Sequence, residues 1–166
     1  MAQYGLGLLP PTLAALWLVP GPGRVAARRA VLAAGLSCAL AVAIVVGLDA
    51  IGGLGRVRPF AALGLVPLVP HSADASFPSD HALVSAAVAW PLLARRPGVG
   101  AWCLLVALIV GLARVAAGLH FPSDVLGSAL LAALPAAAGL GLETALAGTP
   151  LVRRATGQGL GEERST

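Results

Sequence analysis

Long apolar stretches follow one another along this chain, and they allow very few kinds of fold. Residues 30–48, 99–113 and 125–142 carry no charged side chain. A helix needs about 20 consecutive apolar residues to cross a bilayer. Inside a bilayer, a single segment satisfies its own backbone hydrogen bonds only as a helix. The sequence therefore predicts an all-α integral membrane protein, built as a bundle of transmembrane helices.

The overall composition points the same way. Hydrophobic residues make up 58% of the chain and charged residues 11%, whereas soluble domains are about 45–50% apolar and about 25% charged. At about 20 residues for each span, 166 residues allow five or six transmembrane helices and little else. We expect one membrane-embedded domain over residues 1–150 and a disordered cytoplasmic tail over residues 151–166.

Turn signals and short polar stretches separate the expected spans. The first apolar run lacks the positively charged start of a signal peptide, so we interpret it as a retained span. Residues 61–69 are too few to cross and are expected to lie at the membrane interface or to re-enter the membrane. The predicted spans are residues 4–20, 30–48, 81–94, 99–119 and 125–147.

The arginines are distributed unevenly between the two sides of these spans. Three of the eleven basic residues, Arg56, Arg58 and Arg114, fall on one side together with all three histidines. The other eight fall on the opposite side: Arg24, Arg28, Arg29, Arg95, Arg96, Arg153, Arg154 and Arg164. Cytoplasmic loops carry the excess of positive charge, so the polar site is expected at the outer ends of the helices, outside the plasma membrane. The net charge of +4 is expected to meet lipid headgroups, and no nucleic-acid partner is expected.

The most informative polar stretch runs from Arg114 to Asp124. It places an arginine, a histidine and a carboxylate in an apolar region, where each is costly unless it is used. Asp124 follows His120 by four residues, so with a helix starting through Pro122 its carboxylate is expected to reach an imidazole nitrogen. Such a contact orients a nucleophile or base. The guanidinium of Arg114 suits phosphate oxygens, and a phosphate-handling site is the first interpretation.

A second stretch, residues 77–81, precedes the third expected span. A helix amino terminus there offers free N–H groups and a partial positive charge to an anion. Ser79 can donate its hydroxyl to a phosphate oxygen, and His81 can protonate a leaving oxygen as general acid. Arg58, restricted by the proline that follows it, supplies a further guanidinium.

Three short motifs resemble the signatures of the type-2 phosphatidic acid phosphatase superfamily. They are Arg58-Pro59, Pro78-Ser79-x-His81 and Arg114-x5-His120-x3-Asp124, and the resemblance covers roughly residues 50–130. The resemblance implies phosphate-ester hydrolysis through a phosphohistidine, without metal or other cofactor.

The same resemblance implies a role for each motif residue. His120 would be the nucleophile, Asp124 its orienting partner and His81 the acid for the leaving group. The phosphoryl oxygens would be held by Arg58, Ser79 and Arg114, with the backbone around Asp80 helping.

Three positions depart from the family's usual pattern. Ile51 stands where the first motif usually has a lysine, and Arg56 is the candidate replacement for that phosphate contact. Ala113 stands where the third motif usually has a serine. Asp80 replaces the glycine of the second motif, as in the bacterial undecaprenyl-diphosphate phosphatases associated with bacitracin resistance. The resemblance to that group implies a polyprenyl diphosphate as substrate.

Two other functions remain open from the residues. The substrate could be a lipid phosphate monoester: phosphatidylglycerophosphate, phosphatidic acid or decaprenyl phosphoribosyl phosphate. Alternatively, the chain could bind a lipid phosphate without hydrolysing it, although a binder has no need of the paired His120 and Asp124. We interpret His71 and Asp74 as part of a solvated turn, and Glu143 as reaching toward the inner membrane face.

Overall fold

The structure is a computed structural model, and it describes residues 5–158. Over these residues the chain is helical with no strand, as predicted. The elements are η1 (Gly5–Leu8), α1 (Leu9–Trp17), α2 (Arg24–Ala50), α3 (Pro59–Ala62), α4 (Asp80–Arg95), α5 (Pro97–Ala116), α6 (Pro122–Leu131), α7 (Ala133–Leu146) and α8 (Pro150–Thr156).

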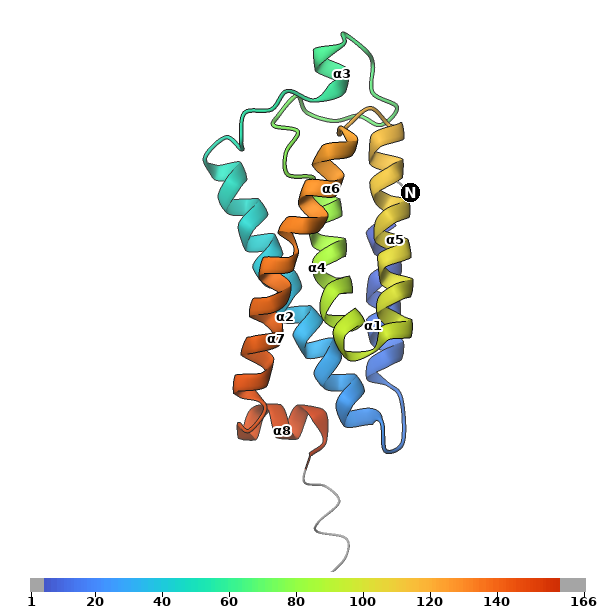
Figure 1. The fold of residues 1–166 in the computed structure, drawn as a ribbon, viewed down its shortest axis with the longest axis vertical. Coiled ribbons are helices and arrows are strands. Elements are labelled where there is room, and N and C mark those ends of the chain that lie inside the picture. The colour runs from blue at the N-terminus through green and yellow to red at the C-terminus, as the bar shows by residue number, and fades with distance from the viewer. Residues whose placement is uncertain (1–4, 159–166) are drawn as a thin grey trace, which may run out of the picture.

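The longer helices lie roughly along one axis and form a bundle with α4 at its centre. Helix α4 packs against α2, α5, α6 and α7, while α3 caps one end of the bundle and α8 lies across the other (Figure 1). The buried residues of α4 are mostly small, including Ala82, Ala86, Ala87 and Ala89. Small side chains let helix backbones approach closely, which is how helices pack inside a membrane.

Two contacts show how closely α2 approaches its neighbours. A Cβ atom at Gly139 in α7 would lie only 2.7 Å from the backbone nitrogen of Ser37, so glycine is required at this crossing. The Ser37 hydroxyl donates a 2.6 Å hydrogen bond to the Ala87 carbonyl of α4. Hydrogen bonds of this kind add to the packing energy between helices in an apolar environment.

Three helical stretches within residues 5–158 are long and apolar enough to cross a membrane. They are residues 24–50, 97–116 and 122–146, the last formed by α6 and α7 together. The apolar helical stretch over residues 5–17 is shorter, and α4 has 16 residues. The expected count of five or six spans is thus larger than these three stretches alone support.

The expected disordered tail begins instead with a helix. Thr149 accepts a hydrogen bond from the Val152 N–H, and Pro150 occupies the first turn of α8. Gly157 ends the helix with φ 79°, in the left-handed region that glycine favours. Residues 151–156 of the expected tail belong to this short helix, which a cap at each end and the buried Thr156 stabilise. Residues 159–166 of the expected tail lie outside the described residues.

Glu143 is buried rather than directed to the inner membrane face. Its side chain is 1% exposed, and its carboxylate lies 2.6 Å from Nε of Arg29 and 2.8 Å from Nη2 of Arg95. These three residues belong to α7, α2 and α4, which meet at this point. Two arginines satisfy a carboxylate that would otherwise be costly to bury, so the ion pairs join three helices at the α8 end of the bundle.

Candidate active site

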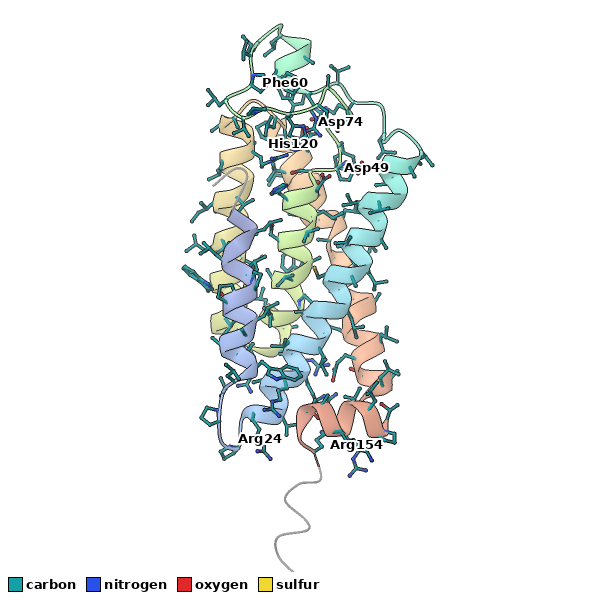
Figure 2. All side chains as sticks on the ribbon, turned by 180° about the vertical axis from the view of Figure 1, so that it is seen from behind. Arg24, Asp49, Phe60, Asp74, His120 and Arg154 are labelled. Atoms are coloured by element: carbon teal, nitrogen blue, oxygen red, sulfur yellow. The ribbon has the colours of Figure 1, made fainter. Side chains whose placement is uncertain are left out.

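The polar residues of the three motifs gather at the end of the bundle capped by α3. Figure 2 shows His120, Asp74 and Phe60 together at this end, with Arg24 and Arg154 at the opposite end. His120 lies in the turn between α5 and α6, and its side chain is almost completely buried. The candidate site is therefore built where helix ends and the loop over residues 63–79 meet.

Local sequence explains how His120 is held in this turn. Helix α5 ends at Ala116, and Gly118 adopts φ 74°, which lets the chain reverse direction. Proline at the first position of α6 starts the next helix, as predicted. Asp124, in the first turn of α6, accepts a 2.8 Å hydrogen bond from the Phe121 N–H. The turn thus holds the imidazole between two well-defined helix ends.

The hydrogen-bond partners of His120 define its tautomer. Nδ1 lies 2.7 Å from the carbonyl oxygen of Ser76, which can only accept, so in the neutral ring Nδ1 carries the proton. Nε2 therefore carries the lone pair. Its neighbours are Nη1 of Arg58 at 3.1 Å and Nη2 of Arg114 at 3.4 Å. A nucleophilic nitrogen thus faces two guanidinium groups.

Both arginines are buried, with side chains about 3% exposed. Arg58 donates from Nη1 to the Leu119 carbonyl over 3.1 Å and from Nε to the Asp74 carboxylate over 2.6 Å. Nη2 of Arg114 lies 3.0 Å from Nε2 of His71. His71 and Asp74 are therefore partners of the two arginines. The segment is still solvated, as interpreted from the sequence, because the Asp74 side chain is 57% exposed.

The predicted contact between Asp124 and the His120 ring is not formed. The Asp124 carboxylate instead accepts from the Ser76 hydroxyl over 2.6 Å and from Nη1 of Arg56 over 2.6 Å. The start of α6 turns the carboxylate toward its own helix terminus, and the Ser76 carbonyl takes the ring nitrogen that it was expected to bind. Among the described hydrogen bonds, Asp124 is linked to the imidazole through Ser76.

Arg56 points toward Asp124 and not toward Nε2 of His120. It also donates to the Ser123 hydroxyl over 3.0 Å, and its guanidinium lies over the Phe121 ring at 4.4 Å. At 43% exposed, it is far more accessible than Arg58. Its described contacts give it the position of a partner for Asp124 rather than of a direct phosphate contact.

The second motif forms the start of α4, as predicted. Ser79 is the N-cap residue, and its N–H donates to the Ser128 hydroxyl over 2.7 Å. The Ser79 hydroxyl is buried and has no hydrogen-bond partner among residues 5–158. Asp80 and His81 follow in the first turn and are partly exposed. Asp80 lies close enough to Arg58 and Arg114 for their charges to act on it.

The surroundings of His120 keep its ring neutral near pH 7. Burial, which penalises the charged imidazolium, is the largest effect; the positive charges of Arg58 and Arg114 add to it. The Ser76 hydrogen bond and the Asp124 charge oppose these effects, and the resulting pKa is about 4. A neutral imidazole with its lone pair on Nε2 is the form that can act as a nucleophile.

Three residues of this site were missed or set aside at the sequence level. Ser76 lies two residues before the second motif with no spacing signal of its own. His71 and Asp74 lie in a loop whose path no periodic pattern defines. One signal was available, since a histidine and a carboxylate occur in the segment that joins the first motif to the second.

A match to a known family covers most of this arrangement. Residues 30–143, which include all three motifs, match the PAP2 superfamily. The chain belongs to the PAP2 superfamily. All of the predicted site residues fall within the matched region.

Individual PAP2 relatives are similar over part of their own length. The chain is 33% identical over 132 residues to undecaprenyl-diphosphatase BcrC of Bacillus subtilis (strain 168), covering 80% of this chain and 66% of that protein. It is 38% identical over 80 residues to the bacitracin transport permease protein BcrC of Bacillus licheniformis, covering 48% of this chain and 39% of that one. The chain therefore spans less than two thirds of the length of each of these relatives.

A solved PAP2 structure has the same fold. It is the crystal structure of a transmembrane PAP2 type phosphatidylglycerolphosphate phosphatase from Bacillus subtilis. The two folds match with a TM-score of 0.50 at 24% sequence identity. The match covers 90% of this chain and 73% of that one. The helical bundle is thus a PAP2 transmembrane fold, and the chain is a multi-pass membrane protein.

Proposed function

We propose that this PAP2 protein is a lipid phosphatase that hydrolyses a polyprenyl diphosphate, such as undecaprenyl diphosphate, to the monophosphate. The observation that carries the proposal is the neutral His120 ring, whose Nε2 lone pair faces Arg58 and Arg114. Two guanidinium groups around a nucleophile match a phosphoryl group, which has several negative oxygens around its phosphorus. The 33% identity to an undecaprenyl-diphosphatase supports the choice of substrate.

The first chemical step transfers the terminal phosphoryl group to the protein. Nε2 of His120 attacks the terminal phosphorus, and the bond from phosphorus to the bridging oxygen breaks. His81 gives its proton to the departing oxygen, which leaves as polyprenyl phosphate. The ring proton on Nδ1 stays hydrogen-bonded to the Ser76 carbonyl and stabilises the positive charge that develops on the imidazole.

The second step releases the phosphoryl group to water. His81, now neutral, takes a proton from a water molecule as the water oxygen attacks phosphorus. The bond between phosphorus and Nε2 breaks, inorganic phosphate leaves, and both histidines return to their starting forms.

The basic groups stabilise the charge on the transferring phosphoryl oxygens. Arg58 and Arg114 move their hydrogen bonds from the imidazole to those oxygens, and the buried Ser79 hydroxyl gains a partner that it lacks in the described structure. Stabilisation of this kind is usually the largest contribution to catalysis. The backbone at Asp80, at the start of α4, adds free N–H groups. Arg56 contributes through its ion pair with Asp124.

We also infer five spans and an outward-facing site within one domain over residues 1–150. The spans are η1 with α1, α2, α4, α5, and α6 with α7, which all run along the bundle axis (Figure 1). Arg24 and Arg154 lie at the end opposite His120 (Figure 2). With that arginine-rich end in the cytoplasm, the phosphatase site opens at the outer leaflet.

The test is phosphate release by the purified protein in detergent, with undecaprenyl diphosphate as substrate and a metal chelator present. We expect release that persists with chelator and falls about a thousandfold or more in His120→Ala. Labelled substrate and rapid denaturation should trap acid-labile, base-stable phosphate on the wild-type protein and none on the variant. The matched control is Arg153→Gln, at the opposite end of the bundle. Normal turnover by His120→Ala would refute the mechanism.

The same assay separates the other functions. Phosphatidylglycerophosphate, phosphatidic acid and decaprenyl phosphoribosyl phosphate are assayed beside the diphosphate. Release from a monoester alone would reassign the substrate. Tight binding of these lipids with no release from any would identify a lipid-phosphate binder.

A further inference from the structure

An apolar cavity of about 460 Å³ lies beside the proposed phosphate site, and the hydrolysis itself does not use it. Its lining comes from two segments, residues 59–68 around α3 and residues 115–118 at the end of α5. The residues that line it have no charged or polar side chain. Its volume lies within the range of about 300–1,000 Å³ that is usual for small-molecule sites.

The cavity and the phosphate site share one wall. Arg58 immediately precedes the first lining segment, and Arg114 immediately precedes the second. The two segments are joined by hydrogen bonds from the Phe60 N–H to the Gly118 carbonyl and from the Leu68 N–H to the Ala117 carbonyl. The next carbonyl, at Leu119, accepts from Arg58. A molecule with its phosphate between the arginines therefore has this cavity next to it.

Several cavity residues expose large apolar side chains. Leu63, Val66 and Leu68 are each at least two thirds exposed, although Phe60 beneath them packs on Ala117 and Leu119. Because residues 61–69 are expected at the membrane interface, a hydrocarbon chain can pass from the bilayer onto these side chains without exposure to water. Figure 2 places Phe60 and His120 at the same end of the molecule.

We propose that this cavity receives the first isoprenoid units of the substrate tail, an inference that rests on the proposed function. In a polyprenyl diphosphate the apolar chain begins directly after the phosphates. In a glycerolipid, ester and hydroxyl groups occupy that position, and this wall offers no polar side chain to pair with them. The cavity thus selects substrates in which phosphate and hydrocarbon are adjacent.

The remainder of the tail has a continuous path into the bilayer. Val115 and Ala116 line the cavity, and on the same helix Leu112, Leu108 and Leu105 are exposed. Residues three or four apart share a face of a helix. The outer face of α5 therefore leads the later isoprenoid units from the cavity to the lipid.

The experiment measures kcat/KM for substrates with graded tails: inorganic pyrophosphate, which has none, then dimethylallyl, geranyl and farnesyl diphosphate. For the wild-type protein we expect kcat/KM to rise with the first two or three isoprenoid units. In Leu63→Asn/Leu68→Asn we expect the ratio of farnesyl diphosphate to pyrophosphate to fall by about tenfold. Leu151→Asn, an equally exposed leucine on α8, should leave the ratio unchanged. An unchanged ratio in the double variant would overturn the tail site while leaving the proposed function intact.

A second measurement uses the unaltered protein, so it does not depend on how the variants fold. A farnesyl diphosphate analogue with a photoreactive group on its second isoprenoid unit should crosslink to residues 59–68 or 115–118. Crosslinks confined to other segments would overturn the tail site. Failure of the wild-type protein to hydrolyse any diphosphate would instead overturn the proposed function, and the tail site with it.

Discussion

The Ser76 hydroxyl donates a 2.6 Å hydrogen bond to the Asp124 carboxylate, and the carbonyl of the same serine accepts from the His120 ring over 2.7 Å. Ser76 thereby connects the Asp124 carboxylate to His120, the proposed nucleophile. Asp124 acts on the imidazole by holding the loop that orients it, in addition to its charge. Ser76 is therefore a positioning residue for the proposed reaction.

Replacing Ser76 with alanine should lower kcat about tenfold with little change in KM. The variant keeps the carbonyl that orients His120 but leaves the buried Asp124 carboxylate with one partner fewer, a loss of about 1–2 kcal/mol. Asp124→Asn should be slower still, because it also breaks the ion pair with Arg56. The double variant should be no slower than Asp124→Asn, since both changes interrupt one connection. If the fall in kcat of the double variant equals the product of the falls in the two single variants, Ser76 and Asp124 act separately.

As the pH is lowered, kcat/KM should fall with a midpoint near pH 4 rather than near pH 6.5. Burial and the two arginines lower the pKa of His120 to about 4, so the neutral nucleophile persists through mildly acidic conditions. Arg114→Gln removes one of the positive charges and should move this midpoint upward. A midpoint near pH 6.5 in the wild-type protein would contradict the described environment of His120.

The same pKa has a consequence for stability. The unfolded chain takes up a proton on His120 near pH 6.5, whereas the folded protein takes it up only near pH 4. In this window the unfolded state binds more protons, so the His120 contribution lowers the free energy of unfolding as pH falls from about 6.5 to about 4. The His120→Ala variant should lose this part of the pH dependence in detergent unfolding experiments.

Asp74→Asn should lower KM about threefold with kcat nearly unchanged. The Asp74 carboxylate accepts a hydrogen bond from the Arg58 guanidinium. In the proposed mechanism the same guanidinium binds the phosphoryl oxygens of the substrate. Burial alone would raise the pKa of Asp74, but hydrogen bonds from Ser72 and Arg58 lower it, so the carboxylate competes with phosphate as an anion. Asp49→Asn is the control for charge alone, because Asp49 acts on Asp80 but has no hydrogen bond to Arg58 among the described residues. A higher KM in Asp74→Asn would mean that Asp74 aligns Arg58 instead of occupying it.

Glu143→Gln should lower the free energy of unfolding by about 2 kcal/mol. Removing one partner of a buried ion pair costs about 3–5 kcal/mol, and the partial exposure of Arg29 and Arg95 reduces that penalty. The unfolding midpoint in detergent measures the effect. The folded variant should keep the wild-type kcat, because Glu143 lies far along the bundle from His120; a matching loss of kcat would show that the two ends are coupled.

Residues that carry charge within apolar surroundings were predictable from the sequence. Arg58, Arg114 and His120 stand out because burial of a polar group is costly, and they do come together. Ser76 and Asp74 were not predictable, because their positions depend on the path of an irregular loop. The partners of Glu143 depend on which helix faces meet, and spacing along one helix does not define that. For α8, the capping signals at Thr149 and Gly157 are in the sequence, but the charged composition of the tail outweighed them.

Glu143 and its two arginines also distinguish the two ends of the bundle mechanically. They join α2, α4 and α7 at the end that carries α8 through ion pairs. At the other end, the loop around Ser76 and Asp74 is held by hydrogen bonds to Asp124, His120 and Arg58. The α8 end of the bundle is therefore joined directly from helix to helix, whereas the His120 end is joined through a loop.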